Sequence, residues 1–111
     1  MRLLILLTLA ELTLVSSLTA QTPSARNGKK IFDSYGCYQC HDHDGHGGTG
    51  ARLAPNPIPF ASFSKYVRQP TGEMPPYTRK VVSDQELADI YAYLQSIPQP
   101  PPAKSIPILN R

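Results

Sequence analysis

The sequence predicts a small all-α domain in which three to four short helices are joined by long loops rich in glycine and proline. Three segments carry apolar residues at three- and four-residue steps, the spacing of a helix with one buried face. No segment shows the strict alternation of apolar and polar residues that is typical of a half-buried strand. The chain has 111 residues with 12 prolines and 7 glycines, so it can bury only a small core by itself.

The first 20 residues are expected to be a secretory signal peptide that is cleaved. Arg2 precedes the apolar run at residues 3–20, and small residues end that run. An uncleaved membrane anchor is the alternative, but Glu11 interrupts the run, and a bilayer span takes about 20 apolar residues. We therefore expect a domain at residues 21–98 with no stable membrane span after cleavage. Residues 99–111 form a Pro-rich tail that is predicted to be an extended, polyproline-like arm.

The first predicted helix covers residues 24–36. Ser24 can cap its start and Gly36 can end it. One face of this helix collects the residues at helical spacing, which are Gly28, Ile31, Phe32 and Tyr35.

Two more helices are predicted further along the chain. Residues 59–70 form a short one with proline at each end, and its apolar side carries Phe63, Tyr66 and Val67. Residues 83–98 form the clearest one, because Ser83 and Glu86 fit a capping box and Pro98 stops the helix. Its apolar stripe is expected to consist of Leu87, Ile90, Tyr91 and Leu94.

The only two cysteines lie in the stretch GCYQCHD. Cys37, Cys40 and His41 would share one side of a helical turn at these spacings. The pattern C-x-x-C-H is typical of c-type haem attachment, in which each thiol forms a thioether with a haem vinyl group and the histidine ligates the iron. A thioredoxin-like site would need a βαβ context, a zinc site would need more ligands, and a disulfide here would close a trivial loop. Covalent haem c is therefore the favoured interpretation.

Met74 is predicted to be the second axial ligand of the haem iron. It is the only methionine that remains after signal cleavage, and it lies in GEMPPY, where two prolines stiffen the backbone. A core methionine that fills a gap is the alternative, but this segment has no helical face. His43 and His46 are closely tethered to His41 and are expected to be exposed loop residues.

Four segments in this order resemble the class I mono-haem cytochromes c of the bacterial periplasmic type: GKKIFDSYGCYQCH, DGHGGTGARLAP, MPPY and LADIYAYLQSIP. The resemblance implies a fold around one covalent haem c in which the first and last helices cross, with Gly28 and Phe32 meeting Tyr91 and Leu94. It also implies a backbone carbonyl that accepts the second ring N–H of His41. The family often has Gly-Pro where this chain has Gly50–Ala51, so that carbonyl is expected from Ala51 or a neighbour. Arg52 is a candidate contact for a haem propionate, with a solvated surface arginine as the alternative.

These features predict a soluble periplasmic electron carrier that exchanges electrons with a redox donor and a redox acceptor and is not an enzyme. The alternatives are a haem subunit of a dehydrogenase or oxidase complex and a haem protein that binds a gas ligand. The formal net charge of +3 is small, and the basic residues are not clustered among aromatic ones, so no nucleic-acid partner is expected.

Overall fold

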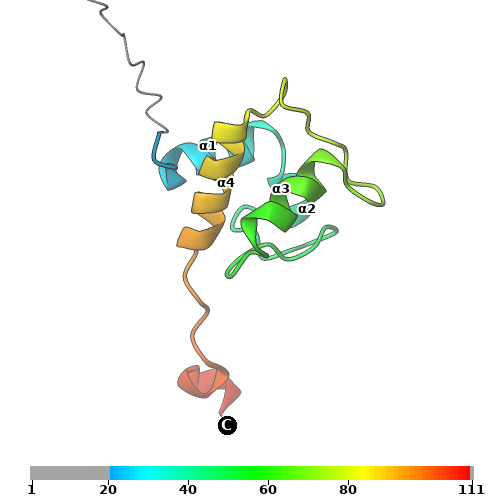
Figure 1. Ribbon diagram of the computed structural model, residues 1–111. Coiled ribbons are helices and arrows are strands. Elements are labelled where there is room, and N and C mark those ends of the chain that lie inside the picture. The colour runs from blue at the N-terminus through cyan, green and yellow to red at the C-terminus, as the bar shows by residue number, and fades with distance from the viewer. Residues whose placement is uncertain (1–20, 111) are drawn as a thin grey trace, which may run out of the picture.

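The computed structural model describes residues 21–110, and these fold into a small helical domain with a C-terminal arm (Figure 1). The helices are α1 (Ala25–Ser34), α2 (Tyr38–His41), α3 (Phe60–Arg68) and α4 (Asp84–Ser96). No strand occurs within the described residues, so the predicted all-α class is confirmed. The predicted signal peptide lies outside the described residues.

Both predicted helix starts are confirmed by their hydrogen bonds. Ser24 Oγ accepts from the backbone N–H of Asn27 at 3.2 Å, which caps α1. At α4, Ser83 Oγ accepts from Glu86 N at 3.1 Å and Glu86 Oε2 accepts from Ser83 N at 2.7 Å, a complete capping box. The chain turns sharply after α1 because Gly36 adopts a positive φ of 76°.

The first and last helices cross, as the family resemblance implied (Figure 1). Gly28 lies at the crossing, where a Cβ atom would overlap the carbonyl of Asp89 and come within 2.8 Å of Ile90 N. Only a glycine allows this approach of the two backbones. The resemblance implied that Gly28 and Phe32 would meet Tyr91 and Leu94, and the α4 atoms nearest to Gly28 belong to Asp89 and Ile90. Phe32 shares the core with Leu94 and also packs on Tyr93, with ring centroids 5.7 Å apart.

Helix α4 packs against α3 and α1, and Tyr91 and Tyr93 each contact a different one of them. Tyr91 lies against Phe60 and Phe63 of α3, with ring centroids 5.1 and 5.3 Å apart. Tyr93 is buried toward α1 and was missing from the predicted stripe. Residues two positions apart on a helix point in directions about 200° apart, so Tyr91 and Tyr93 contact partners on opposite sides of α4. A stripe drawn for one partner could include only one of them.

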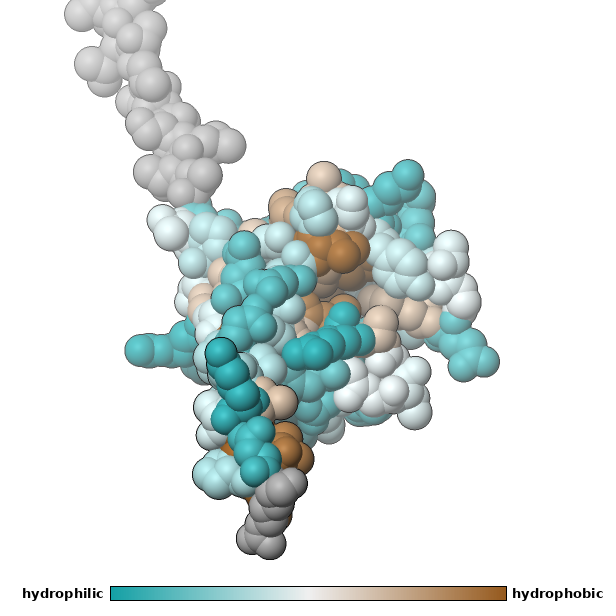
Figure 2. All heavy atoms as spheres, turned by 90° about the horizontal axis from the view of Figure 1, so that it is seen from below, coloured by the Kyte–Doolittle hydropathy of each residue, from teal (hydrophilic) through white to brown (hydrophobic). Residues whose placement is uncertain are grey.

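The core is small and is shared by the three longer helices and two loop positions. On α3 it takes in Phe63, and Val67 packs against it, whereas Tyr66, which was predicted on the same side, is 42% exposed. On the face shown in Figure 2, hydrophobic side chains are visible at the floor of a hollow. The buried hydrophobic residues are Ile31, Phe32, Ala54, Phe63, Val82, Leu87, Ile90, Tyr93 and Leu94.

One carboxylate is buried between α1 and α4. Asp89 is only 4% exposed, and it accepts hydrogen bonds from Ser24 N at 2.8 Å, Asn27 Nδ2 at 2.7 Å and Gln85 Nε2 at 3.0 Å. Burial alone would raise the pKa of Asp89, but these hydrogen bonds outweigh it and hold the pKa below its usual value. The charge therefore ties the first turn of α1 to the middle of α4.

The tail is only partly the extended arm that was predicted. It ends in two 3₁₀ turns, η1 (Ala103–Ser105) and η2 (Pro107–Leu109). Asn110 Nδ2 stabilises them by donating to the carbonyls of Lys104 at 2.7 Å and Ile106 at 3.0 Å. No helix in residues 21–110 is long and apolar enough to cross a membrane.

Candidate functional site

The cysteine and histidine motif is carried by the single turn of α2. Cys37 precedes the helix with helical backbone angles, and His41 N donates to Cys37 O at 3.1 Å. The three side chains therefore project from one turn, as their spacing predicted. Both cysteines are free thiols, so the motif is not closed by a disulfide.

His41 is held by a carbonyl of the following loop. Its Nδ1 lies 2.7 Å from the carbonyl oxygen of Ala51. A carbonyl can only accept, so Nδ1 carries a proton, and the neutral form of the ring then has its lone pair on Nε2. The expectation that Ala51 or a neighbour would supply this carbonyl is met by Ala51 itself. A hydrogen bond of this kind fixes the orientation of a ligating imidazole and raises its basicity.

The glycine-rich loop is folded tightly back over the motif. Gly50 N donates to Cys40 O at 2.8 Å, and Gly47 N donates to His41 O at 2.9 Å. A Cβ atom on Gly50 would lie 2.9 Å from His41 Cε1 and 3.1 Å from Cys40 Cβ. Glycine is therefore required where the loop passes the imidazole, and the position is explained by close approach alone.

Met74 lies half-buried in the loop between α3 and α4, and that loop is tied down on both sides of it. On one side, Tyr66 Oη donates to Thr71 O at 2.7 Å. On the other, Tyr77 N donates to Val67 O at 3.0 Å, and Tyr77 Oη donates to Tyr35 O at 3.1 Å. The last of these bonds joins the loop of Met74 to the segment that leads into Cys37.

Two groups of this region, Cys37 and Tyr77, have raised pKa values. Burial raises the pKa of the Cys37 thiol to about 11, so this thiol is protonated near neutral pH. The pKa of Tyr77 is also raised, first by burial and then by the neighbouring Cys37 and Cys40. These shifts agree with the bond from Tyr77 Oη to Tyr35 O, which joins the loop of Met74 to the segment leading into Cys37.

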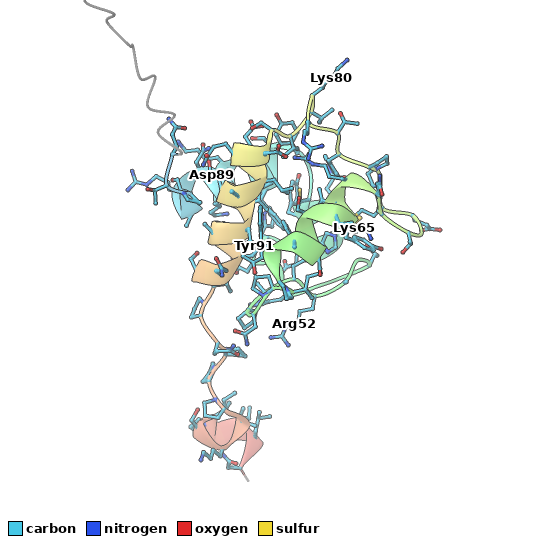
Figure 3. All side chains as sticks on the ribbon, in the orientation of Figure 1. Arg52, Lys65, Lys80, Asp89 and Tyr91 are labelled. Atoms are coloured by element: carbon cyan, nitrogen blue, oxygen red, sulfur yellow. The ribbon has the colours of Figure 1, made fainter. Side chains whose placement is uncertain are left out.

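The other predicted residues lie outside this contact. Arg52 is exposed and points away from the helices in Figure 3, and its Nε donates to Ala54 O at 2.9 Å. His43 and His46 are exposed, as predicted. His43 stacks on Tyr38 with ring centroids 4.3 Å apart. In residues 21–110, no three His, Cys, Asp or Glu side chains gather closely enough to hold a metal ion.

Arg68 is the main residue of this region that the sequence did not indicate. Its side chain is only 11% exposed, and it donates from Nη1 to Tyr77 O at 2.9 Å and to Val82 O at 2.6 Å. Its Nη2 lies 2.9 Å from Asp84 Oδ1. These acceptors are 9, 14 and 16 residues away along the chain, so no local pattern could have predicted them.

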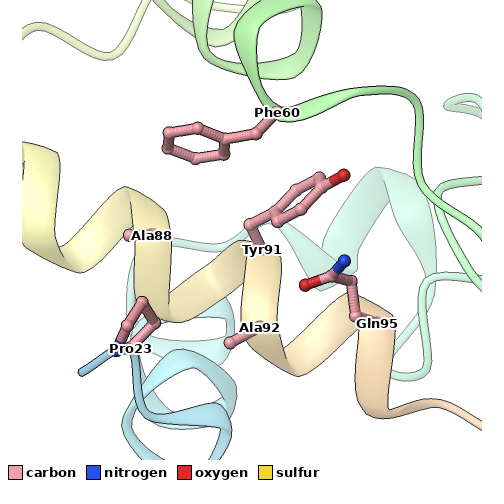
Figure 4. Close-up of a pocket in the computed structure, with 6 residues that line it drawn as sticks. All are labelled: Pro23, Phe60, Ala88, Tyr91, Ala92 and Gln95. Carbon is pink, nitrogen blue, oxygen red and sulfur yellow. The ribbon is translucent and has the colours of Figure 1, made fainter.

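A separate shallow groove runs along α4 (Figure 4). Its polar groups are the Gln95 amide and the hydroxyl of Tyr91, and that hydroxyl already donates to Ile58 O at 3.0 Å. The groove therefore presents no pair of titratable groups for catalysis. It is lined by Pro23, Phe60, Ala88, Tyr91, Ala92 and Gln95.

The residues around α2 fit a covalently attached haem. Two free thiols stand on the same turn as an imidazole whose Nε2 lone pair is available. The small core leaves apolar side chains at the floor of a hollow, where a large apolar group could cover them (Figure 2). This donor set, thiols for thioethers and a neutral imidazole for iron, is the one that a c-type haem requires.

Comparison with known proteins agrees with this assignment. A search of curated proteins and a search of solved structures found no match. A protein-family model, described as cytochrome c oxidase, cbb3-type, subunit III, matches residues 23–94. This match covers α1, the cysteine and histidine motif, the loop of Met74 and α4 as far as Leu94. The chain therefore belongs to this family of c-type cytochromes, whose domain carries covalent haem and transfers electrons.

Proposed function

We propose that this protein is a soluble, single-haem electron carrier of the periplasm, of the class I type. Residues 1–20 would direct export and be removed, and residues 21–98 would form the working domain. Cys37 and Cys40 would hold the haem through thioethers. His41 and Met74 would be its axial ligands. The observation that carries the proposal is the hydrogen bond from His41 Nδ1 to Ala51 O, since it leaves Nε2 ready to bind iron.

Each of these residues has a defined task. Ala51 keeps the imidazole of His41 in one orientation and one tautomer. Tyr77 holds the end of the Met74 loop beside the cysteines. A methionine ligand favours a high reduction potential. When bound, the haem supplies a site that gains and loses one electron.

This assignment also explains why the protein would be a carrier and not an enzyme. With His41 and Met74 both on the iron, no position remains for a substrate. The groove along α4 offers no catalytic pair of its own. Donor and acceptor would be other redox proteins that approach the surface of the domain. Arg52 is proposed to contact a haem propionate through its Nη groups, since its Nε donates to Ala54 O.

A haem subunit of an oxidase is the second proposal, and the description of the family favours it. In that case the same site would pass electrons within a complex. A native size well above that of the 12.2 kDa chain would support the subunit over the free carrier. A protein that runs as a monomer and still exchanges electrons quickly with a soluble donor would support the carrier.

Covalent attachment is tested first. Acidified acetone should leave the haem on the protein, and the intact mass should rise by one haem. Cys37→Ala and Cys40→Ala should each lower the yield of haem-bearing protein sharply, while Ser105→Ala, in the tail, should not. Haem that is extracted freely from the wild type would refute attachment through these cysteines.

Met74 ligation separates the carrier from a gas-binding protein. The oxidised protein should show the weak near-infrared band of a sulfur–iron(III) bond, and the reduced protein should bind carbon monoxide slowly. Met74→Ala should abolish the band, lower the potential and speed carbon monoxide binding. A wild type that lacks the band and binds carbon monoxide at once would favour the gas-binding alternative.

A further inference from the structure

We propose that Arg68 is a positioning residue that keeps the Met74 loop closed, and so sets how often the methionine leaves the iron. This inference rests on the proposed function, because it takes Met74 as an axial ligand. It concerns a side chain that need not touch the haem and that acts through the backbone of the loop.

The contacts of Arg68 connect three segments of the chain. The residue ends α3, and its guanidinium donates to Tyr77 O and Val82 O and pairs with Asp84 at the start of α4. Tyr77 lies three residues after Met74, and Val82 is only 2% exposed in the core. One planar side chain therefore joins the last turn of α3, the far arm of the Met74 loop and the first residue of α4.

The two ties of Tyr77 make its position depend on Arg68. The carbonyl of Tyr77 is held by Arg68, and its hydroxyl reaches Tyr35 O, in the segment that leads to Cys37. If the guanidinium is lost, the backbone at Tyr77 keeps its N–H bond to Val67 but loses a charge-assisted bond. The Met74 loop then opens more easily at Tyr77, the residue that connects it to the segment leading into Cys37.

Arg68 is poorly explained as a simple stabilising contact. Its Nε is buried and has no hydrogen-bond partner in the described part of the chain. A buried donor without a partner destabilises a fold. The side chain is thus placed where Nη1 reaches two carbonyls of the loop and Nη2 reaches Asp84 at the start of α4, although this leaves Nε unused.

The residue type also fits the role. A guanidinium presents several N–H groups in a rigid fork, so it can span two carbonyls and a carboxylate. A lysine ammonium is a single flexible point and cannot reproduce that geometry. Arg68→Lys therefore keeps the charge and removes the clamp, whereas Arg68→Gln removes both.

The experiment uses the haem-bearing full chain in the reduced state, mixed with excess carbon monoxide. Binding requires Met74 to leave, so the observed rate reports how often the loop opens. Loss of one or two charge-assisted bonds predicts a rate increase of roughly ten- to hundredfold for Arg68→Gln. Arg68→Lys should lie between it and the wild type. In the oxidised state, the near-infrared sulfur band should be weaker in both variants than in the wild type, or should disappear at a lower temperature.

Arg79→Gln is the matched control. Arg79 is 72% exposed, and its Nε pairs with the same Asp84 at 2.9 Å. Within residues 21–110, its side chain donates no hydrogen bond to a carbonyl of the Met74 loop. Its rate should match the wild type. Amide hydrogen exchange gives a second measurement for variants with lower haem yield. Exchange at Tyr77 N should speed up in Arg68→Lys, while exchange at Leu87 N, in α4, should not.

The outcomes separate the two proposals. A wild type without the sulfur band would refute Met74 ligation itself. A wild type with the band, and Arg68 variants that keep both the band and the slow rate, would overturn only the role of Arg68. Variants with an intact band but an altered pH dependence of the potential would also overturn it, because they would place Arg68 on the haem carboxylates.

Discussion

At the scale of single residues, Gly50 shows how tightly the motif is enclosed. Its backbone N–H binds Cys40 O, and its missing side chain makes room for the ring of His41. Gly50 has no positive φ, so its φ angle does not itself require a glycine. The constraint is one of space, and it falls directly on the imidazole.

Gly50→Ala is therefore expected to displace the His41 ring and weaken its bond to Ala51. Overpacking of this kind costs about 1–3 kcal/mol. Urea unfolding of the haem-bearing protein should show that loss, together with a shifted potential. Thr49→Ala, one residue earlier on the exposed loop, should leave both unchanged. Equal stability and potential in Gly50→Ala and wild type would show that the loop yields without cost.

Asp89 is the second residue whose role follows from its surroundings. Three donors surround its carboxylate, and its pKa is lowered. A group with a depressed folded pKa adds stability above its unfolded pKa of about 3.9. That stability is lost as the pH falls through the lower, folded pKa.

Asp89→Asn should lower the free energy of unfolding by about 1–3 kcal/mol at pH 7. The NH₂ group of asparagine would face donors that now bind a carboxylate oxygen, so at least one of them would lose its acceptor. The difference from wild type should shrink as the pH falls below about 4. Urea unfolding at pH 7 and pH 3 measures this. Asp42→Asn, which removes an exposed carboxylate at a positive φ that asparagine also tolerates, is the control. A difference that stays constant with pH would exclude a role for the charge.

At the scale of elements, α4 organises the domain because it contacts both α1 and α3. Its start is fixed twice, by the Ser83 and Glu86 capping box and by the pairing of Asp84 with Arg68 and Arg79. Hydrogen bonds from Arg79 and then Arg68 lower the pKa of Asp84. The carboxylates of this first turn also interact favourably with the positive end of the helix dipole.

Ser83→Ala should remove the cap and cost about 1 kcal/mol of stability. Ser62→Ala, at an exposed position inside α3, should change stability by less than about 0.5 kcal/mol. Thermal unfolding of the two variants separates the effect of losing the cap from the effect of losing a serine hydroxyl elsewhere. If the two variants unfold at the same temperature, Arg68 and Arg79 fix the helix start without the serine.

The elements that could be predicted are those whose signals are local. Ser24 and Ser83 cap helices through bonds to residues three positions away, and so the sequence shows them directly. Tyr93 was missed because its burial depends on where α1 crosses. The 3₁₀ turns of the tail were missed because the prolines there suggested only an extended arm.

The same division holds for the site. Cys37, Cys40 and His41 lie on one turn, so spacing predicted their arrangement on α2. Arg68 could not be predicted, because its acceptors depend on the path of a loop that has no periodic pattern. The ligand roles of the motif and of Met74, and the propionate contact of Arg52, stay predictions that the experiments above address.

At the scale of the whole molecule, the domain and the tail are separate. In the described part of the chain, the hydrogen bonds of residues 101–110 stay within the tail. Ile108 and Leu109 are 69% and 62% exposed. The tail is thus not needed to complete the core.

Removal of residues 99–111 should therefore leave the thermal midpoint of the haem-bearing protein within about 4 °C of wild type, since such surface changes rarely exceed about 0.5 kcal/mol. If the tail docks onto a redox partner, the truncated protein should exchange electrons with that partner more slowly. A large fall in the midpoint would show instead that the tail packs on the domain.

The uneven packing around α4 has a consequence for how the molecule comes apart. Helices α1 and α4 are joined along their crossing by Gly28, Phe32 and the buried Asp89. Helix α3 reaches α4 through aromatic rings on Tyr91 and through the pairing of Arg68 with the exposed Asp84. We therefore expect the chain to unfold as two units of unequal stability. The weaker unit is the one that carries Met74, so heating or mild denaturant should detach the methionine side of the site while the two terminal helices remain paired.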